Sequence, residues 1–220
     1  MPGPRAGGPV TTWMSVTVIT HTGEVSRWEP EGRRRLHEAA LALFAERGFA
    51  QTTTAAIAER AGLTERTFFR YFPDKREVLF DGGHETQEIL VAAVAAAPPE
   101  ATTLEVIVAG LAAVAGRMQP ARPLVQQRAA IIAAHAELRE RELAKLEAWS
   151  AGLTAAFTQR GMDDPAARLA AGLAITVFRA AFQRWVTDPG EPGPAGPGLA
   201  GPDLASTVRS VVQDLGVLVA

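Results

Sequence analysis

The most constraining feature of this chain is a pair of short helical patterns on either side of Gly62. Threonines precede each pattern as possible N-caps, and Gly62 suits a turn in which the backbone takes a positive φ. Neither pattern is long enough to bury much apolar surface alone, so the two must share a small core. The spacing predicts a helix-turn-helix, with Ala58 small where its helices cross. The residues available for its core are Leu43, Phe44, Ile57, Ala58, Ala61, Leu63, Phe68 and Phe72.

The outward face of the second short helix is cationic and aromatic. If the two phenylalanines of the core point inward, a step of about 100° per residue places Arg66 and Arg70 near the opposite side. Thr67 and Phe69 then flank these arginines. An exposed Phe beside two Arg is unusual for a solvated helix, but it suits a face that is desolvated against a sugar-phosphate groove and base edges. This face predicts contact with nucleic acid.

Helix N-termini beside this face predict phosphate contacts. Lys75 and the amides after Asp74 would lie at the start of a further helix, where the helix dipole and the lysine both favour an anion. The amides after Thr53 or Thr54 offer the same on the other side.

Residues 33–35 are three consecutive arginines, and two interpretations of them stay open. They are either the solvated start of a helix or an arm that reaches the minor groove.

Helical periodicity continues along the rest of the chain, and no strand alternation competes with it. Gly82 and Gly83 are expected to bend or weaken the fourth helix, and Asp164 and Asp203 are expected to cap later ones. We predict an all-α protein of about nine helices. Besides the two short helices, they span about 31–47, 75–97, 103–118, 123–134, 136–160, 165–187 and 203–218.

Composition divides this helical pattern into domains. Residues 1–26 are mixed in composition and predict a flexible arm, in which 16–19 could pair as a short strand. Residues 27–81 form the expected helix-turn-helix domain, and residues 82–220 hold the rest of the helical pattern. The Pro- and Gly-rich segment 189–202 reads as a surface loop of polyproline character.

Composition also excludes several classes of protein. Lys plus Arg number 22 against 24 Asp plus Glu, so no overall basic field indicates nucleic acid, and local patterning must carry any such role. The chain has no Cys, which excludes a disulfide framework, a thiolate zinc site and a cysteine nucleophile. No run of 18 apolar residues and no signal-peptide pattern is present, so we expect a cytoplasmic protein without a membrane span.

Catalytic and metal-binding patterns are also missing from the sequence. His84 and Glu88 lie four residues apart, and His135 precedes Glu137 by two, but neither pair has a third ligand nearby. No phosphate-binding Gly-rich loop, nucleophile elbow or paired-carboxylate motif is present. We therefore expect no catalytic residue, no metal and no cofactor.

The segment from about Arg33 to Asp81 resembles the TetR family of bacterial transcriptional regulators. A first helix that ends in FAERGF is followed by the threonines, by IAERAGLTERTFFRYF and by PDK. The resemblance implies a homodimer, a variable C-terminal domain over residues 82–220 that binds a small effector and forms the dimer, and repression that the effector releases. The family usually has Tyr at the position of Phe69 and His or Tyr at the position of Tyr71, so Phe69 lacks a hydroxyl for phosphate. The DNA-binding candidates are Thr53, Thr54, Thr64, Arg66, Thr67, Phe69, Arg70, Tyr71 and Lys75.

The C-terminal half carries aromatic residues in apolar helices, where core packing is the simplest interpretation of each one alone. Their concentration also permits an apolar pocket with few polar groups. The effector-binding candidates are Met118, Gln127, Ile131, His135, Trp149, Phe178, Arg179 and Phe182.

Apolar stripes near the C-terminus have little chain left to cover them and predict a helix-on-helix dimer. They contain Leu173, Val177 and Arg184 in one helix and Leu204, Val208, Val211, Val212 and Leu215 in the last.

Together these features favour a ligand-responsive repressor that binds a palindromic operator in double-stranded DNA as a homodimer. The effector would be a small apolar or amphipathic molecule of unknown identity. The alternative is a helical-bundle enzyme or small-molecule carrier whose N-terminal hairpin is only structural. An activator or a non-specific nucleoid-type binder would share the same DNA contacts.

Overall fold

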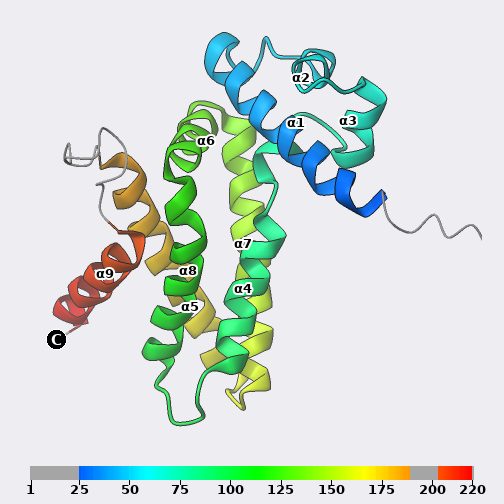
Figure 1. The fold of residues 1–220 in the computed structure, drawn as a ribbon. Coiled ribbons are helices and arrows are strands. Elements are labelled where there is room, and N and C mark those ends of the chain that lie inside the picture. Colours follow the sequence, from blue (N-terminus) through cyan, green and yellow to red (C-terminus); the bar gives the residue numbers. More distant parts are fainter. Residues whose placement is uncertain (1–24, 189–202, 220) are drawn as a thin grey trace, which may run out of the picture.

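The computed structural model describes residues 25–188 and 203–219, and these residues form nine α-helices and two 3-10 turns without a strand (Figure 1). The all-α prediction is confirmed. The expected strand at 16–19, most of the expected arm and the loop at 189–202 lie outside the described residues. The helices are α1 Val25–Arg47, α2 Thr54–Arg60, α3 Glu65–Tyr71, α4 Gly83–Ala96, α5 Thr103–Met118, α6 Arg122–Ala134, α7 Ala136–Gln159, α8 Asp164–Thr187 and α9 Leu204–Val219, and the turns are η1 Glu77–Phe80 and η2 Gln119–Ala121.

The last five helices begin and end within one residue of their predicted limits because strong local signals mark their ends. The Thr102 side chain and Glu105 form a reciprocal capping box at the start of α5. At the start of α8 the cap is Asp163, which accepts a hydrogen bond from the Ala166 amide, and not the predicted Asp164. Asp203 caps α9 as predicted, since its carboxylate accepts from the Ala205 and Ser206 amides.

Two predictions near the N-terminus were wrong in their limits. The first helix starts at Val25, earlier than expected, so it includes residues assigned to the arm. The single helix predicted over 75–97 is divided into η1 and α4. The division occurs at Gly82, whose φ of +78° lies in the left-handed region that a helix interior does not permit.

The N-terminal unit, which we define as α1, α2, α3 and η1, lies across one end of the bundle formed by α4 to α9 (Figure 1). Its core contains Phe68 of α3 and Phe72, which follows α3, in one cluster with residues of α1 and η1. Ile132 of α6 and Leu138 of α7 belong to the same cluster of buried side chains. The N-terminal unit therefore packs directly onto α6 and α7 through a shared apolar core.

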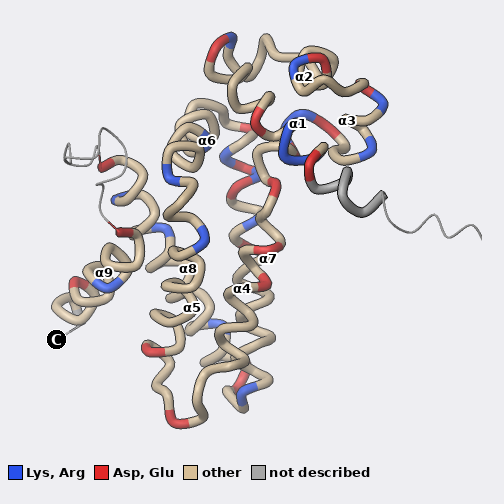
Figure 2. Tube along the Cα trace, in the orientation of Figure 1, with Lys and Arg blue, Asp and Glu red and all other residues tan. Residues whose placement is uncertain are grey.

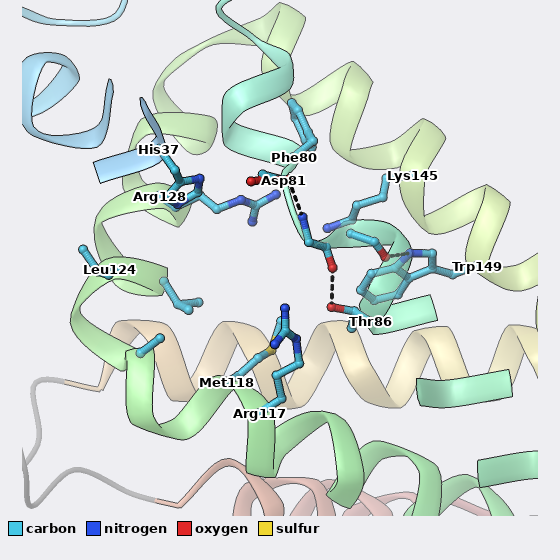
Figure 3. Close-up of a pocket in the computed structure, with 14 residues that line it drawn as sticks. His37, Phe80, Asp81, Thr86, Arg117, Met118, Leu124, Arg128, Lys145 and Trp149 are labelled. Atoms are coloured by element: carbon cyan, nitrogen blue, oxygen red, sulfur yellow. Dashed lines mark hydrogen bonds between the residues drawn. The ribbon is translucent and has the colours of Figure 1, made fainter. Parts of the chain in front are cut away.

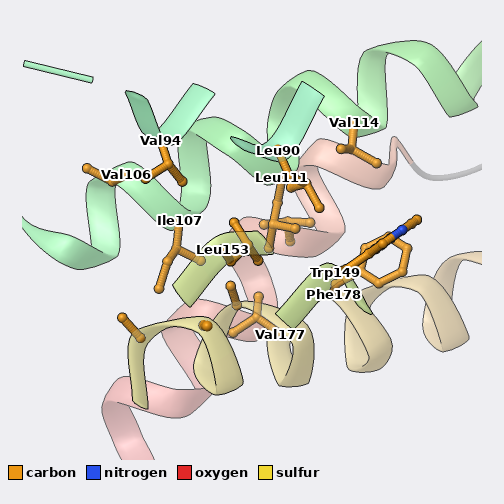
Figure 4. Close-up of a cluster of buried hydrophobic side chains, with 14 of the residues drawn as sticks. Leu90, Val94, Val106, Ile107, Leu111, Val114, Trp149, Leu153, Val177 and Phe178 are labelled. Carbon is orange, nitrogen blue, oxygen red and sulfur yellow. The ribbon is translucent and has the colours of Figure 1, made fainter. Parts of the chain in front are cut away.

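The bundle has its own core, in which α4, α5, α7 and α8 pack side by side (Figure 4). Trp149 of α7 and Phe178 of α8 meet there with ring centroids 5.4 Å apart. The last helix, α9, is covered by α5 and α8. Its residues Leu204, Val208 and Val211 are buried, as is Val177 of α8. The stripe expected to form a dimer interface thus packs largely inside one chain, because α9 folds back onto the bundle.

Two helical stretches, Thr103–Ala134 and Asp164–Thr187, are long and apolar enough to cross a membrane when only length and composition are considered. In the structure η2 interrupts the first stretch, which also contains the buried Arg122. The apolar face of the second stretch lies in the bundle core. Core helices have the same composition as membrane helices, so these stretches alone indicate little about a membrane.

Adjacent phenylalanines on α3 allow a matched test of this fold. Phe68→Ala deletes a fully buried ring and should lower the free energy of unfolding by about 3–5 kcal/mol. Phe69 is 52% exposed, so Phe69→Ala should change it by only about 0.5 kcal/mol. Urea unfolding followed by circular dichroism measures both. Equal losses for the two variants would show that α3 does not face the core as described.

Candidate functional site

The turn between α2 and α3 has the predicted helix-turn-helix geometry. The side chain of Thr53 accepts a hydrogen bond from the Ala56 amide, and that of Thr64 accepts from the Thr67 amide, so each helix has a threonine cap. Gly62 has a φ of +65°. A Cβ on Gly62 would lie 2.6 Å from Nη2 of Arg35, but that flexible side chain can shift, so the positive φ is what requires glycine here.

The three arginines at 33–35 are held within the N-terminal unit. Arg33 pairs with Asp81 at 2.7 Å and lies over the Phe72 ring. Arg35 donates a hydrogen bond to the Ala61 carbonyl at the C-terminus of α2. Arg34 pairs with two glutamates of its own helix. The cluster thus lies inside α1, and the contacts of Arg33 and Arg35 fix α1 to the rest of the unit, which neither the solvated helix start nor the minor-groove arm had predicted.

The predicted outward face of α3 is present. Arg66, Phe69 and Arg70 are exposed, and Thr67 beside them is half-buried. Lys and Arg gather on α3 and on the adjoining part of α1, whereas the part of α7 nearest the N-terminal unit carries both cations and carboxylates (Figure 2). Arg66 makes no hydrogen bond or ion pair with another described residue, so its guanidinium is available to a partner. Together the four residues line a shallow concavity that follows the helix.

The remaining candidates of the DNA-binding set surround this face. Arg70 donates to the Tyr71 hydroxyl at 3.1 Å, and its guanidinium lies 4.9 Å from the Tyr71 ring centroid. The Thr54 hydroxyl donates to the carboxylate of Glu65, which ties the start of α2 to the start of α3. The Thr64 and Thr67 hydroxyls are 2.9 Å apart. The structure therefore brings eight of the nine candidates to one edge of the N-terminal unit.

Lys75 differs from its predicted environment. Its ammonium donates hydrogen bonds to the carbonyls of Phe49 and Thr52 at 2.7 and 2.8 Å and to that of Ala50 at 3.3 Å. It also lies 4.5 Å from the Phe49 ring centroid, and partial burial lowers its pKa. The expected phosphate site at the amides after Asp74 is already occupied. The Asp74 carboxylate itself accepts hydrogen bonds from the amides of Arg76 and Glu77. Lys75 thus fixes the loop between α1 and α2.

The effector candidates do not line a single pocket. Gln127 donates to the Leu41 carbonyl of α1 at 2.9 Å, Ile131 packs against the core of the N-terminal unit, and the His135 ring lies 5.1 Å from that of Phe49. These three residues contact the N-terminal unit instead of a ligand pocket. Sequence reasoning could not detect this because each has the helical spacing of an ordinary bundle residue.

Met118 and Trp149 line a cavity of about 250 Å³ between the N-terminal unit and the bundle, which we call the junction cavity (Figure 3). Three cations, one carboxylate and one histidine line it as well. These titratable residues are Arg117, Arg128, Lys145, Asp81 and His37. Burial lowers the pKa of His37, whose Nδ1 lies 3.0 Å from the Val78 carbonyl oxygen. The sequence analysis missed all five, because they come from four separate helices and from the residue after η1 and share no local pattern.

Phe178, Arg179 and Phe182 line a second concavity of about 380 Å³ between α6, α7 and α8, which we call the outer groove. Its floor is apolar and includes Leu146 and Ile132. Arg128 and Glu142 line it from the side that faces the junction cavity. The effector candidates are therefore divided between two spaces with different chemistry.

Metal binding finds no support in the part of the chain that the structure describes. Within residues 25–188 and 203–219, no group of three or more His, Asp or Glu side chains is arranged to hold a metal ion. His84 and Glu88 form an exposed pair at 3.2 Å, and His135 packs on Phe49. The two weak pairs of the sequence analysis are thus surface and packing contacts.

The geometry of Lys75 gives a prediction for stability. Lys75→Met keeps most of the side-chain volume but leaves three carbonyls without their donor, so the free energy of unfolding should fall by about 1–3 kcal/mol. Arg76→Met is the control, because Arg76 is exposed and pairs only with the nearby Asp74; it should change stability by less than about 1 kcal/mol. Denaturant midpoints measure both. An unchanged midpoint in Lys75→Met would contradict the anchoring role.

Comparison with known proteins places the chain among transcriptional regulators. Residues 36–81 match the family model of the bacterial regulatory proteins of the tetR family, and residues 101–196 match the model of the MftR C-terminal domain. The HTH-type transcriptional regulator TcmR of Streptomyces glaucescens is 34% identical over 87 residues, which are 40% of this chain and 38% of TcmR. The match therefore spans less than half of that relative.

Solved structures share the fold over most of both chains. The transcriptional regulator FadR from Bacillus subtilis, in complex with stearoyl-CoA, has a TM-score of 0.56 at 19% identity and covers 83% of this chain and 96% of its own. A TetR-family regulator from Streptomyces coelicolor has a TM-score of 0.52 at 20% identity, with 87% and 96% covered. Because matched residues lie in both the N-terminal unit and the bundle, and the helix-turn-helix geometry agrees, the chain belongs to the TetR family of bacterial transcriptional regulators.

Proposed function

We propose that this protein is a repressor that binds a palindromic operator as a homodimer and leaves it when a small effector binds to the bundle. The exposed face of α3 carries this proposal, since two arginines and a phenylalanine point outward from a helix that the buried Phe68 anchors in the core. Arg66 and Arg70 would read base edges in the major groove, with Thr67 and Phe69 beside them. Thr53, Thr54, Thr64 and Tyr71 would contact the backbone, and Lys75 would hold the loop that positions α2.

A palindromic site requires two copies of α3 about 34–36 Å apart, related by a two-fold axis. The buried residues of α9 cannot form that dimer, but other apolar side chains on α8 and α9 remain exposed. Leu169 is 76% exposed, and Val217 and Leu218 are 81% and 82% exposed. We propose that helix-on-helix packing through these residues forms the dimer.

The effector would occupy the junction cavity, because that cavity is lined by both the N-terminal unit and the bundle. A ligand there can favour one arrangement of the two parts over the other and shift the population away from the DNA-binding state. The excess of cations in the lining favours an anionic group on the ligand. Stearoyl-CoA in the similarly folded Bacillus subtilis regulator makes acyl-CoA molecules a first class to test.

The domain boundary and the place of action follow from this proposal. We place the boundary between residues 81 and 82, where the left-handed Gly82 separates η1 from α4. The N-terminal unit then comprises the DNA-binding domain at 27–81, and the bundle comprises the effector and dimerisation domain at 82–220. A repressor acts where chromosomal DNA and metabolites meet, which in a bacterium is the cytoplasm.

Operator binding tests the assignment of α3. On a duplex selected from a random pool, Arg66→Ala or Arg70→Ala should weaken binding by about 1–3 kcal/mol and relax preference at one position in each half-site. Arg168→Ala is the control, since Arg168 is an exposed arginine of α8 far along the chain from α3. Fluorescence anisotropy measures the affinities. If the two α3 variants fold and bind as the wild type does, α3 does not face DNA.

The assembly is tested by multi-angle light scattering at micromolar concentration, where the wild type should be a dimer. Leu169→Glu should produce a folded monomer, because a charge buried at the interface would be unpaired. Leu104→Glu is the matched control at an exposed leucine of α5 and should remain dimeric. A wild-type protein of 23.3 kDa in solution would exclude a preformed dimer and with it the palindromic operator.

A further inference from the structure

The junction cavity and the outer groove are separated by a small buried network of charges. Glu142 of α7 accepts a hydrogen bond from Arg128 of α6 at 2.8 Å through one oxygen and from Lys145 at 2.7 Å through the other. All three side chains are largely shielded from solvent, with exposed fractions of 15%, 21% and 11% for Arg128, Glu142 and Lys145. We call these three residues the partition.

The partition has one side toward each space. Arg128 and Lys145 line the junction cavity, and Figure 3 shows both extending toward its centre from α6 and α7. Arg128 and Glu142 line the outer groove. Beyond the partition the groove offers the apolar surface of Phe178, Phe182 and Leu146. A cationic space and an apolar space thus adjoin across one ion-pair network.

Arg128 also contacts the N-terminal unit. Its Nε donates to the Leu79 carbonyl of η1, and its guanidinium lies 5.3 Å from the centroid of the Phe80 ring. Arg141 holds η1 from α7, through two hydrogen bonds to Glu77 at 2.7 and 2.9 Å, but lines neither space. Arg128 is therefore the residue that joins the wall between the two spaces to the segment that precedes α4.

Electrostatics determines what can open the partition. Burial alone would raise the pKa of Glu142, but the charges of Arg128 and Lys145 outweigh it and lower that pKa. Burial and the nearby Arg128 lower the pKa of Lys145 to about 8. Removing Glu142 from this network would leave two buried cations uncompensated, which is strongly unfavourable. A ligand that supplies its own anionic group in place of Glu142 avoids that penalty.

We propose that the partition selects ligands by length: an amphipathic anion releases DNA only when its chain is long enough to cross from the junction cavity into the outer groove. Its head group pairs with Lys145 on the side of the junction cavity in place of Glu142, and a long chain passes Arg128 to lie on Phe178 and Phe182 in the outer groove. Displacement of the partition draws Arg128 from the Leu79 carbonyl and frees η1. Shorter anions occupy the junction cavity and leave the hold on η1 intact. The mechanism rests on the proposed effector response of the bundle.

The test uses sodium n-alkanoates from hexanoate to dodecanoate, each below its micelle-forming concentration, on the full chain bound to its selected operator. Thermal shift measures binding to the protein, and fluorescence anisotropy measures release of the operator. Hexanoate should bind without releasing DNA, whereas dodecanoate at equal occupancy should weaken operator binding at least tenfold. Equal release by all chain lengths at equal occupancy, or release by none, would overturn the proposal.

Four variants separate the partition from general effects on folding. Glu142→Gln keeps the size and one acceptor but weakens the ion pairs, so shorter chains should suffice for release. Leu143→Trp fills the groove mouth at an exposed position, so dodecanoate should lose at least tenfold in affinity while hexanoate is unaffected. Arg168→Gln and Arg209→Gln remove exposed arginines that line neither space and do not contact η1, so they should leave the length threshold unchanged. A shifted threshold in either control would overturn the proposal.

Failure of this mechanism is distinguishable from failure of the proposed function. If the wild type binds no operator at all, the repressor assignment fails, and the dependence of alkanoate binding on chain length and on Leu143→Trp still decides whether a ligand crosses the partition. If the wild type binds its operator but alkanoate affinity does not depend on Leu143, the repressor assignment stands and the partition mechanism fails.

Discussion

The burial of η1 between the N-terminal unit and the bundle is the constraint on which the rest of the structure depends. Val78 and Leu79 are fully buried, and the guanidinium groups of Arg128 and Arg141 both contact the Phe80 ring. The short helices α2 and α3 are seven residues each and gain their stability from this shared core rather than from their own propensity. A displacement of α6 or α7 therefore acts on η1 directly, and through it on the position of α3.

The role of each cationic side chain in this protein depends on where it lies, and the net charge does not indicate that role. The formal net charge is −2, yet the cations near the helix-turn-helix have two different roles. Arg33, Arg35 and Lys75 are bound to carboxylates or carbonyls of their own unit and hold its loops in place. Arg66 and Arg70 extend outward on α3, where desolvation against phosphate and base edges would favour them. A bulk charge count cannot separate these roles, because both kinds of residue contribute equally to it.

The bundle shows a related division between packing and binding. Most of its aromatic residues, such as Trp185 and Phe157, are buried in its core, as expected for large apolar side chains. The polar residues that could bind a ligand are those that several helices bring to one place, as at the junction cavity. Membership of the TetR family gives the general role of such a bundle, while the identity of the lining residues makes this one cationic on one side and apolar on the other.

The amino-acid sequence alone determined the last five helices with their ends and the inward face of α3, because caps, glycine stops and helical periodicity are local properties. It also determined the outward face with Arg66 and Arg70, since the rotation per residue is fixed once Phe68 and Phe72 are buried. Only the tertiary structure decided that Lys75 is an anchor and that His135 is a packing residue. The partners of those side chains lie on other elements. The cavities, too, depend on how helices distant in sequence pack against one another, and local sequence patterns do not predict that packing.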